Sequence, residues 1–391
     1  MPLVLYLLAL AVFAQGTSEF MLAGLLPGIA ADLGVSISAA GSLTSAFAVG
    51  MIIGAPLMAA AAARWSRRNA LLAFLTVFLV VHVIGALTSS YPVLLGTRIV
   101  GALADAGFLA VAMVTAAALV PPNAKGRATS VLLAGTTLAC VVGVPGGALL
   151  GQLWGWRSAF WAVALVSVPA ILAILRAVPD DAGGPVPNPR EEFGALREPR
   201  LLVTLLLGAL VNGATFCAFT YFTPVFTEVA GLGEAWVPAL LALFGLGSFL
   251  GVSAAGRVAD VRPVPLLVAG GAALLAGWAA FALLAAQPAV TIALVLVQGT
   301  LSFAVGSTLI AQALYAAAGA PALAGGFATA AFNVGAAVGP WAGGAAIAAG
   351  LGHRSPLWVS TGLIALALLA AGTVRMKTGP IRLDLVTGVK E

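Results

Sequence analysis

The sequence contains very little charge. Of its 391 residues only 8% are charged, whereas 61% are hydrophobic, and the mean hydropathy is +1.10. Soluble domains average about 25% charged residues, so this composition excludes a fold that faces water on all sides. It predicts an all-α protein whose surroundings are mainly lipid.

Several kinds of site are also missing. The chain has only two cysteines, Cys140 and Cys217, and both lie in apolar runs, so we expect neither a disulfide framework nor a metal site. No Gly-Lys-Ser or Gly-Lys-Thr is present, which argues against an ATP-driven pump within this chain. The two histidines are far apart and no nucleophile or metal set is clustered. We therefore expect no enzyme and no cofactor. Because no Lys or Arg precedes the first apolar run, we also expect no cleavable signal peptide.

What the chain has instead is a series of long apolar runs. A helix needs about 20 apolar residues to cross a bilayer, and a β-barrel would show short alternating segments. Residues 263–353 contain no Asp, Glu, Lys or Arg at all. Bounded by Gly, Pro and charge, twelve runs fall in two sets of six, at about 3–26, 41–62, 70–88, 92–118, 128–151, 158–177, 201–226, 236–256, 265–286, 289–315, 322–349 and 357–374.

The basic residues between these runs predict the orientation. With both termini in the cytoplasm, fifteen Lys and Arg lie inside, only Arg157 and Arg354 lie outside, and Arg98 lies within a span. The positive-inside rule therefore places the chain in the plasma (inner) membrane with cytoplasmic termini. The net charge of +5 follows from this distribution, so it does not indicate a nucleic-acid partner.

The two sets of six spans are a repeat. Gly146-Gly147, Arg157-Ser158 and Trp161 recur 197 residues later as Gly343-Gly344, Arg354-Ser355 and Trp358. We predict a six-helix bundle that carries proton coupling (1–178), a cytoplasmic linker (179–199), a second bundle (200–375) and a cytoplasmic tail (376–391). Duplicated bundles of this kind place a substrate site near the midplane and expose it to each side in turn.

Four local patterns resemble the major facilitator superfamily, and within it the twelve-span drug:proton antiporters. The first span carries an acidic motif, Gly16–Phe20 with Gly24–Pro27, and the fourth span carries Arg98. The fifth span carries a glycine-proline motif, Gly143 with Pro145–Gly147. A basic loop with Arg64, Arg67 and Arg68 has a second copy at Gly256–Asp260. Spans 1 and 4–6 are similar to actinobacterial chloramphenicol-resistance exporters. The first basic loop departs from the pattern, because Ala63 stands at the acidic position, whereas Asp260 keeps it in the second copy.

The candidates for proton coupling are three ionisable residues inside spans. Glu19 lies well within an apolar run, where a charge is expensive, so binding and release of a proton there can bias the conformation. Its alternative role is a structural hydrogen bond to Gln15 or to a neighbouring helix. Arg98 and Asp105 lie seven residues apart on one helix face. Arg98 acts either as an electrostatic partner of Glu19 or as a structural donor to backbone near the fifth helix. Asp105 is an accessory proton or substrate contact.

Other candidates concern packing and the substrate. The glycines of spans 5 and 11 let helices approach closely, and Pro145 and Pro340 are expected to bend these spans; the motif residues are Gly143, Pro145, Gly146, Gly147, Gly339 and Pro340. Span 7 carries a stripe of aromatic and polar side chains at helical spacing. Together with one residue of span 11, this stripe gives the predicted substrate contacts: Asn212, Phe216, Phe219, Thr220, Thr223 and Asn333. The span 7 phenylalanines could equally face lipid. We interpret the single histidine of span 3, His82, as a hydrogen-bonded packing residue.

Taken together, these features predict a secondary antiporter in which proton entry drives export of a small amphiphilic aromatic antibiotic, most naturally chloramphenicol. The expected partners are the drug, protons and the bilayer, with the chain acting as a monomer. A proton-coupled exporter of a sugar or nucleoside is the alternative, although it would need more Asn and Gln in the cavity. A channel would not need the duplicated glycine motifs.

Overall fold

The computed structural model describes residues 2–62, 65–121, 125–178, 198–258, 262–317 and 324–378. Within these residues, twelve helices are long and apolar enough to cross a membrane, and each coincides with one of the twelve predicted runs. The predicted linker (179–199) and tail (376–391) lie almost entirely outside the described residues.

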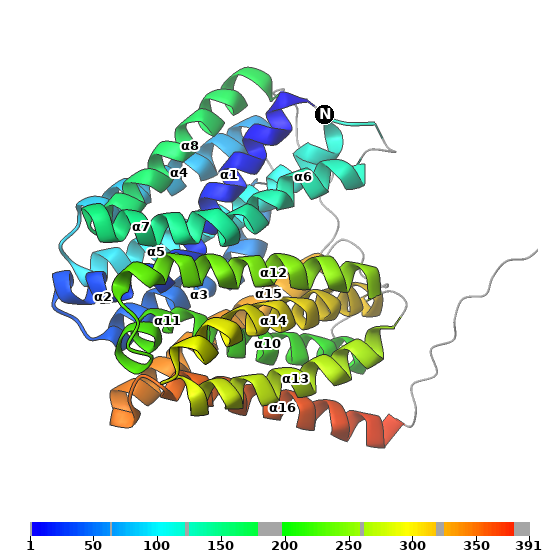
Figure 1. Cartoon of the computed structure of the whole chain (residues 1–391). Coiled ribbons are helices and arrows are strands. Elements are labelled where there is room, and N and C mark those ends of the chain that lie inside the picture. Colours follow the sequence, from blue (N-terminus) through cyan, green and yellow to red (C-terminus); the bar gives the residue numbers. More distant parts are fainter. Residues whose placement is uncertain are drawn as a thin grey trace, which may run out of the picture.

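We call residues 2–178 the N-terminal half and residues 198–378 the C-terminal half. The N-terminal half comprises α1 (Leu3–Phe20), α2 (Leu22–Leu33), α3 (Ile37–Ala62), α4 (Arg67–Leu87), α5 (Tyr91–Ala118), α6 (Lys125–Leu138), the π-helix η2 (Ala139–Gly143), α7 (Val144–Trp154) and α8 (Arg157–Ala177). The C-terminal half comprises α10 (Pro199–Thr220), α11 (Phe222–Pro224), η4 (Val225–Val229), η5 (Glu234–Trp236), α12 (Val237–Val258), α13 (Pro263–Leu284), α14 (Pro288–Ala316), α15 (Ala324–Ala346), η6 (Ile347–Leu351) and α16 (Ser355–Thr378). Figure 1 shows the two halves as two helical bundles that lie side by side.

Glycine in a left-handed conformation ends two of the helices. Gly34 caps α2 with φ 64°, and Gly155 separates α7 from α8 with φ 79°. L-residues with a Cβ are strained at these angles, so glycine is the residue that allows the chain to reverse there.

The first predicted run is broken, and this matters for the site. Instead of one helix over 3–26, α1 ends at Phe20 and α2 begins at Leu22, with the Met21 N–H donating to Thr17 O at 2.8 Å. Within α2, Pro27 has no N–H, so the carbonyl of Ala23 loses its helical partner. The break and the proline therefore leave backbone carbonyl groups free for other donors.

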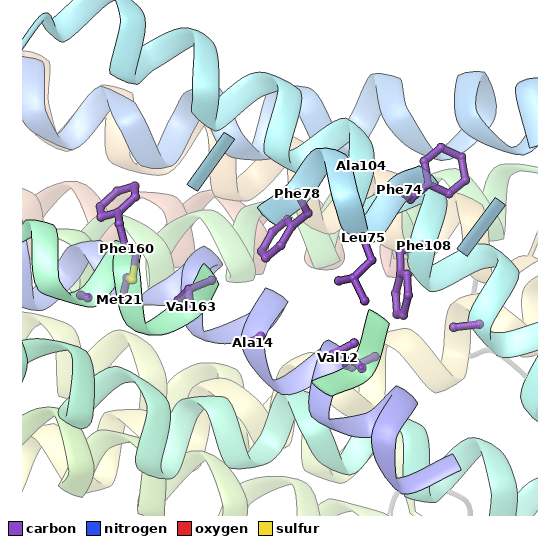
Figure 2. Close-up of a cluster of buried hydrophobic side chains, with 14 of the residues drawn as sticks. Val12, Ala14, Met21, Phe74, Leu75, Phe78, Ala104, Phe108, Phe160 and Val163 are labelled. Atoms are coloured by element: carbon purple, nitrogen blue, oxygen red, sulfur yellow. The ribbon is translucent and has the colours of Figure 1, made fainter. Parts of the chain in front are cut away.

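Two main clusters of buried apolar side chains form the core, one in each half. Figure 2 shows the cluster of the N-terminal half, where side chains of α1, α4, α5 and α8 meet; Phe74 and Phe78 come from α4, Phe108 from α5 and Phe160 from α8. In a membrane such packing is driven by van der Waals contact rather than by water exclusion. It holds α1, α4 and α5 at fixed positions relative to one another.

The halves meet along two main seams and through α2, which packs against α11. α3 packs against α15, and α12 packs against η2 and α7. At Gly245 of α12 the approach is so close that an added Cβ would overlap the carbonyl of Cys140 on η2. In Figure 1, α6 diverges from α12 toward the end of the molecule that holds the N-terminus.

Candidate functional site

The three ionisable residues predicted inside the spans come together in the N-terminal half. Arg98 and Asp105 on α5 are 2% and 5% exposed, and Glu19 near the end of α1 is half-buried. All three interact electrostatically. None of them forms an ion pair within 4.0 Å among the described residues. The fold thus gathers two acids around one guanidinium, and their role in proton coupling stays a prediction.

Arg98 is held by the break in the first span. Its Nη1 donates to the Ser18 hydroxyl and its Nη2 to the Ser18 carbonyl, each at 2.8 Å. The guanidinium also lies over the ring of Phe47 on α3, 4.4 Å from its centroid. The alternative expectation, that Arg98 is a structural donor to backbone near the fifth span, is thus met by a carbonyl of the first span. This carbonyl is free because α1 ends at Phe20.

The prediction for His82 is confirmed. This fully enclosed side chain on α4 makes two hydrogen bonds of 2.6 Å, from Nδ1 to the carbonyl of Phe78 and between Nε2 and the hydroxyl of Ser18. The structural bond between Glu19 and Gln15 is not formed, because both amide atoms of Gln15 are buried without a partner among the described residues.

A small aromatic pocket lies where the halves meet. Phe20 and Cys140 line it from the N-terminal half, and the C-terminal half contributes Thr215, Phe216, Phe219, Phe244 and Phe303. Neighbouring rings contact one another, with centroids 5.6 Å apart for Phe20 and Phe216 and 5.0 Å apart for Phe219 and Phe244. Glu19 precedes the pocket residue Phe20 and acts electrostatically on Cys140, so the acidic cluster and the pocket adjoin.

The span 7 stripe predicted from the sequence divides into two groups. Phe216 and Phe219 line the pocket and are 8% and 7% exposed, so they face the protein interior rather than lipid. Asn212 donates to the carbonyl of Phe332 at 2.7 Å, and Thr223 donates to the carbonyl of Ala23 at 2.5 Å.

Two further polar members are placed differently. The amide of Asn333 bonds to Thr329 O in its own helix at 3.0 Å, and the hydroxyl of Thr220 has no partner among the described residues. The pocket lining includes neither of them, nor Asn212 or Thr223.

Sequence reasoning missed five lining residues: Phe20, Cys140, Thr215, Phe244 and Phe303. Two of them carried a readable signal. Phe20 follows the acidic residue of span 1, and Thr215 precedes Phe219 by one helical turn on the same face. Phe244 and Phe303 carried none, because they reach the pocket only through the tertiary packing of α12 and α14.

The predicted glycine motif serves packing at most of its positions. A Cβ at Gly143 would overlap the hydroxyl of Thr17, and one at Gly147 would lie 3.2 Å from Met21 Cβ. At Gly339 a Cβ would overlap the backbone of Gly213, whereas Gly146 has nothing within 4 Å.

The two prolines of this motif lie in different settings. Pro145 is the second residue of α7, which begins where the π-helix η2 ends. Pro340 lies inside α15, where its carbonyl accepts a 2.9 Å hydrogen bond from the Tyr221 hydroxyl.

The basic loop is described only in part. Arg68 donates to the carbonyl of Leu175 and so ties the start of α4 to the end of α8, whereas the Nε atom of Arg67 is buried without a partner among the described residues. Arg64 and Asp260 lie outside the described residues.

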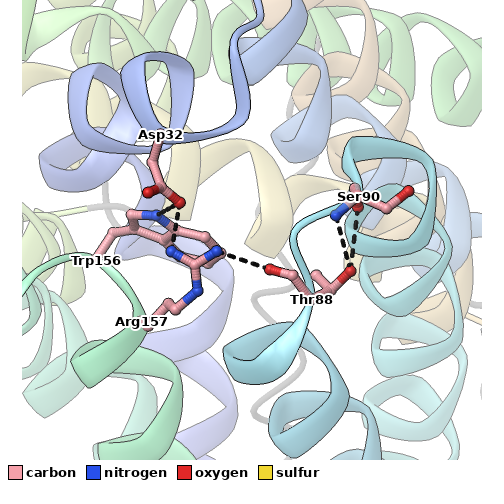
Figure 3. A network of polar contacts seen from close by, with 5 residues as sticks. All are labelled: Asp32, Thr88, Ser90, Trp156 and Arg157. Carbon is pink, nitrogen blue, oxygen red and sulfur yellow. Dashed lines mark hydrogen bonds and ion pairs between the residues drawn. The ribbon is translucent and has the colours of Figure 1, made fainter.

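At the opposite end of the spans, a polar cluster fixes α2 to its own half (Figure 3). Asp32 accepts hydrogen bonds from Arg157 and from Trp156 Nε1, the latter at 3.2 Å, and Arg157 also donates to the carbonyl of Thr88 at 2.9 Å. The Arg157 guanidinium, and secondarily the Trp156 indole, hold the pKa of Asp32 below its usual value.

This same end of the molecule is closed between the halves. Thr223 reaches across to the Ala23 carbonyl that Pro27 leaves free, and Tyr221 is packed so tightly against α3 that a Cβ on Gly41 would overlap its hydroxyl. Gln152 on α7 donates to the backbone of Glu234 in η5. The contacts join α2, α3 and α7 to the C-terminal half.

Comparison with known proteins gives a consistent result. The family model for the Major Facilitator Superfamily matches residues 8–329. The chain is 57% identical to a chloramphenicol resistance protein of Streptomyces lividans over 95% of its own length and 96% of that protein. It is 35% identical to the inner membrane transport protein YdhP of Escherichia coli over 88% and 89%. Among solved structures, an inward-facing bacterial homologue of the human lysosomal transporter Spinster superposes with a TM-score of 0.74 at 19% identity, covering 96% of both chains.

Proposed function

Because the chain belongs to the Major Facilitator Superfamily, we propose that it is a plasma-membrane antiporter that exports chloramphenicol or a similar amphiphilic aromatic antibiotic in exchange for protons. It is a multi-pass membrane protein, and a transporter rather than an enzyme. In the proposal both termini are cytoplasmic, the chain acts as a monomer and the proton gradient supplies the driving force, without a cofactor.

The observation that supports this proposal best is the position of the aromatic pocket. Rings from both halves line it, so the movement of one half against the other changes its shape and its access. Its lining offers aromatic faces and the Cys140 thiol, whereas the Thr215 hydroxyl is bonded to the Val211 carbonyl in its own helix. Such a lining suits a small aromatic compound with few polar anchors. A sugar or nucleoside would need more hydrogen-bond partners than this lining provides. The 57% identical relative named for chloramphenicol resistance supports the same substrate class.

Glu19 is the proposed proton carrier because it adjoins the pocket. When its carboxyl is ionised, it offsets the neighbouring Arg98 charge. When the carboxyl binds a proton, the balance changes and the preferred conformation can change with it. Asp105 shares the same guanidinium and is the accessory acid of the proposal.

Alternation follows from the contacts between the halves. The end that holds α2 and α11 is closed by the bonds to Ala23 and by the packing of Tyr221. In the predicted orientation this is the outer end, so the described conformation corresponds to access from the cytoplasm. Export then requires these contacts to separate while the cytoplasmic ends of the halves come together.

The test is the Glu19→Gln variant in a susceptible host. It keeps the size of the side chain but cannot carry a proton, so we expect drug resistance to fall to the level of the empty vector while membrane insertion is unchanged. Glu234→Gln is the matched control, because the Glu234 side chain is exposed and Gln152 bonds to the backbone carbonyl of Glu234, which the substitution keeps. Normal resistance from Glu19→Gln would refute proton coupling at this residue.

Counterflow of labelled chloramphenicol in proteoliposomes adds a second criterion. A carrier with a fixed site exchanges internal for external drug without a gradient, and a channel does not. Absence of counterflow in the unmodified protein would contradict the proposed antiport.

A further inference from the structure

A continuous chain of buried hydrogen bonds links three spans of the N-terminal half. It runs from Arg98 on α5 to Ser18 on α1, then to His82 and the Phe78 carbonyl on α4, with distances of 2.8, 2.6 and 2.6 Å. Arg98, Ser18 and His82 are 2%, 0% and 3% exposed. Water does not reach these groups, so each depends on the others for its hydrogen bonds.

The direction of every bond in this chain follows from chemistry. A guanidinium only donates and a carbonyl only accepts. Arg98 therefore donates to the Ser18 hydroxyl, and His82 donates from Nδ1 to Phe78. A second positive charge beside Arg98 is unfavourable, so the ring is neutral, Nε2 accepts, and Ser18 donates its proton to it. The Ser18 hydroxyl is thereby held with a lone pair toward Arg98.

Arg98 has few other partners. Ser18 supplies both of its hydrogen bonds, one through the hydroxyl and one through the carbonyl, and its Nε is unpaired among the described residues. Its guanidinium also lies over the ring of Phe47. No carboxylate lies within 4.0 Å of it in the described part of the chain. The position of this charge is thus set by one serine, which is itself oriented by one histidine.

We infer that Ser18 and His82 are positioning residues that fix the Arg98 guanidinium beside the acidic cluster and make α1, α4 and α5 move together. The inference rests on the proposed function, since it assumes that Glu19 carries the proton. The groups around Arg98 are Glu19 from α1, Asp105 from its own helix, neutral His82 from α4, and Phe47 from α3, which carries no charge.

The corresponding positions of the C-terminal half do not carry an equivalent chain. Positions 197 residues after Ser18, His82 and Arg98 are Thr215, Ala279 and Val295, of which only the first can form a hydrogen bond through its side chain. The device therefore belongs to the half that carries the buried charges, and it is not a general requirement of the fold. Thr215 also shows that a threonine fits at the corresponding turn.

The decisive variants are Ser18→Ala and His82→Leu, each paired with a conservative replacement. Ser18→Thr keeps the hydroxyl, and His82→Gln keeps an acceptor where Nε2 lies. A hydrogen bond to a charged group is worth on the order of tenfold or more in an equilibrium constant. We expect about tenfold slower proton-driven chloramphenicol uptake into everted vesicles for Ser18→Ala and His82→Leu, and recovery of most of the rate for Ser18→Thr and His82→Gln.

The pH profile separates positioning from simple loss of packing. When Arg98 is no longer fixed, Glu19 loses part of the positive charge that favours its ionised form, so the half-maximal point of transport should move toward higher pH in Ser18→Ala. The matched control is Ser167→Ala, another fully buried serine of the same half, whose hydroxyl bonds only to Val163 in its own helix. It should leave the profile unchanged.

The outcomes are distinct. An unchanged pH profile in a folded Ser18→Ala protein would overturn the inference, even if Glu19→Gln abolishes transport as proposed. If Glu19→Gln leaves transport intact, the proposed function itself fails. Thermal unfolding in detergent identifies any variant that loses its fold. If Ser18→Ala unfolds, His82→Leu is compared with His82→Gln, and identical pH profiles of these two variants would refute positioning.

Discussion

The two halves have the same succession of spans but different chemistry at equivalent positions. The N-terminal half carries three ionisable side chains inside its spans, and the C-terminal half has neutral residues 197 positions later: Phe216, Val295 and Ser302 in place of Glu19, Arg98 and Asp105. All three neutral residues are buried. One half therefore holds the charges inside its spans, and the other supplies most of the apolar pocket wall.

Buried polar groups follow the same division. In the C-terminal half, the hydrogen-bonding neighbours of Gln298 on α14 orient its side-chain amide. The amide oxygen then accepts hydrogen bonds from Trp278 on α13, including one from Nε1 at 3.2 Å. This pair joins two spans, as the chain of Arg98, Ser18 and His82 joins three in the other half, but neither of its partners is charged. A duplicated architecture can thus keep its polar cross-links between spans while only one copy holds the ionisable groups.

The largest expected effect concerns how tightly the spans of each half approach. Gly339 on α15 faces the backbone of Gly213, which cannot move aside, whereas Gly143 faces the side chain of Thr17. We expect Gly339→Ala to lower the free energy of unfolding by about 3 kcal/mol and Gly143→Ala by about 1 kcal/mol. Thermal unfolding in detergent measures both.

Gly146→Ala is the control for this pair, because nothing lies within 4 Å of an added Cβ there. It should leave the melting temperature unchanged or raise it slightly. Equal losses from Gly339→Ala and Gly143→Ala would show that the two halves pack with the same tolerance.

The next effect concerns charge. Asp105→Asn should slow proton-driven drug transport about tenfold, corresponding to about 1.4 kcal/mol, because the Arg98 charge then lacks one of its two acidic neighbours. Ser302→Ala, at the equivalent position, should transport normally and gain about 1 kcal/mol in stability, because the buried Ser302 hydroxyl has no partner in the described structure. Uptake into everted vesicles and thermal unfolding test the pair. Equal transport defects in the two variants would contradict the division of labour between the halves.

The sequence was sufficient for the architecture because membrane spans are specified by length and composition. The sequence also identified the charged residues that are buried together, because an ionisable group in an apolar run costs free energy wherever the run lies in the fold. It did not reveal the break at Met21 and its consequence, the capture of the Ser18 carbonyl by Arg98. A hydrogen bond between residues 80 positions apart depends on how α1 and α5 pack, and no local pattern encodes that.

The polar residues of span 7 illustrate the same limit. A helical stripe predicts a shared face, but it does not say what covers each turn of that face. Phe216 and Phe219 meet the pocket, Asn212 meets the backbone of α15, and Thr223 lies past the end of α10 against α2. Pro27 was the available signal for Thr223, because a proline inside a helix leaves a carbonyl that some donor must satisfy.

A smaller effect is expected where the halves meet. Thr223→Val removes the hydrogen bond to the Ala23 carbonyl and should destabilise the closed end by about 1 kcal/mol. Pro27→Ala restores an N–H within α2 that can satisfy the same carbonyl, so the double variant should lose less than the sum of the two single changes. Distances between spin labels at the exposed Trp154 and Trp236 positions report opening of this end. Strict additivity would show that the Thr223 bond does not depend on the proline.

The smallest effect concerns two exposed ion pairs, one in each half. Asp32 pairs with Arg157, whose guanidinium is always charged. Glu228 lies 2.7 Å from His353, and these two side chains form a full ion pair only when the histidine is protonated. Both are partly exposed, so each contributes less than about 1 kcal/mol. Asp32→Asn should lower the free energy of unfolding at neutral pH more than Glu228→Gln does, because Asp32 also accepts a hydrogen bond from Trp156.

Arg157 lowers the pKa of Asp32, so the stabilisation by this ion pair is present above the pKa of Asp32 in the unfolded chain. It is lost as the pH falls through the lower pKa of the folded state. Unfolding curves of the unmodified protein and Asp32→Asn should therefore converge in acid, and a gap that persists there would mean that the carboxylate charge is not what fixes α2.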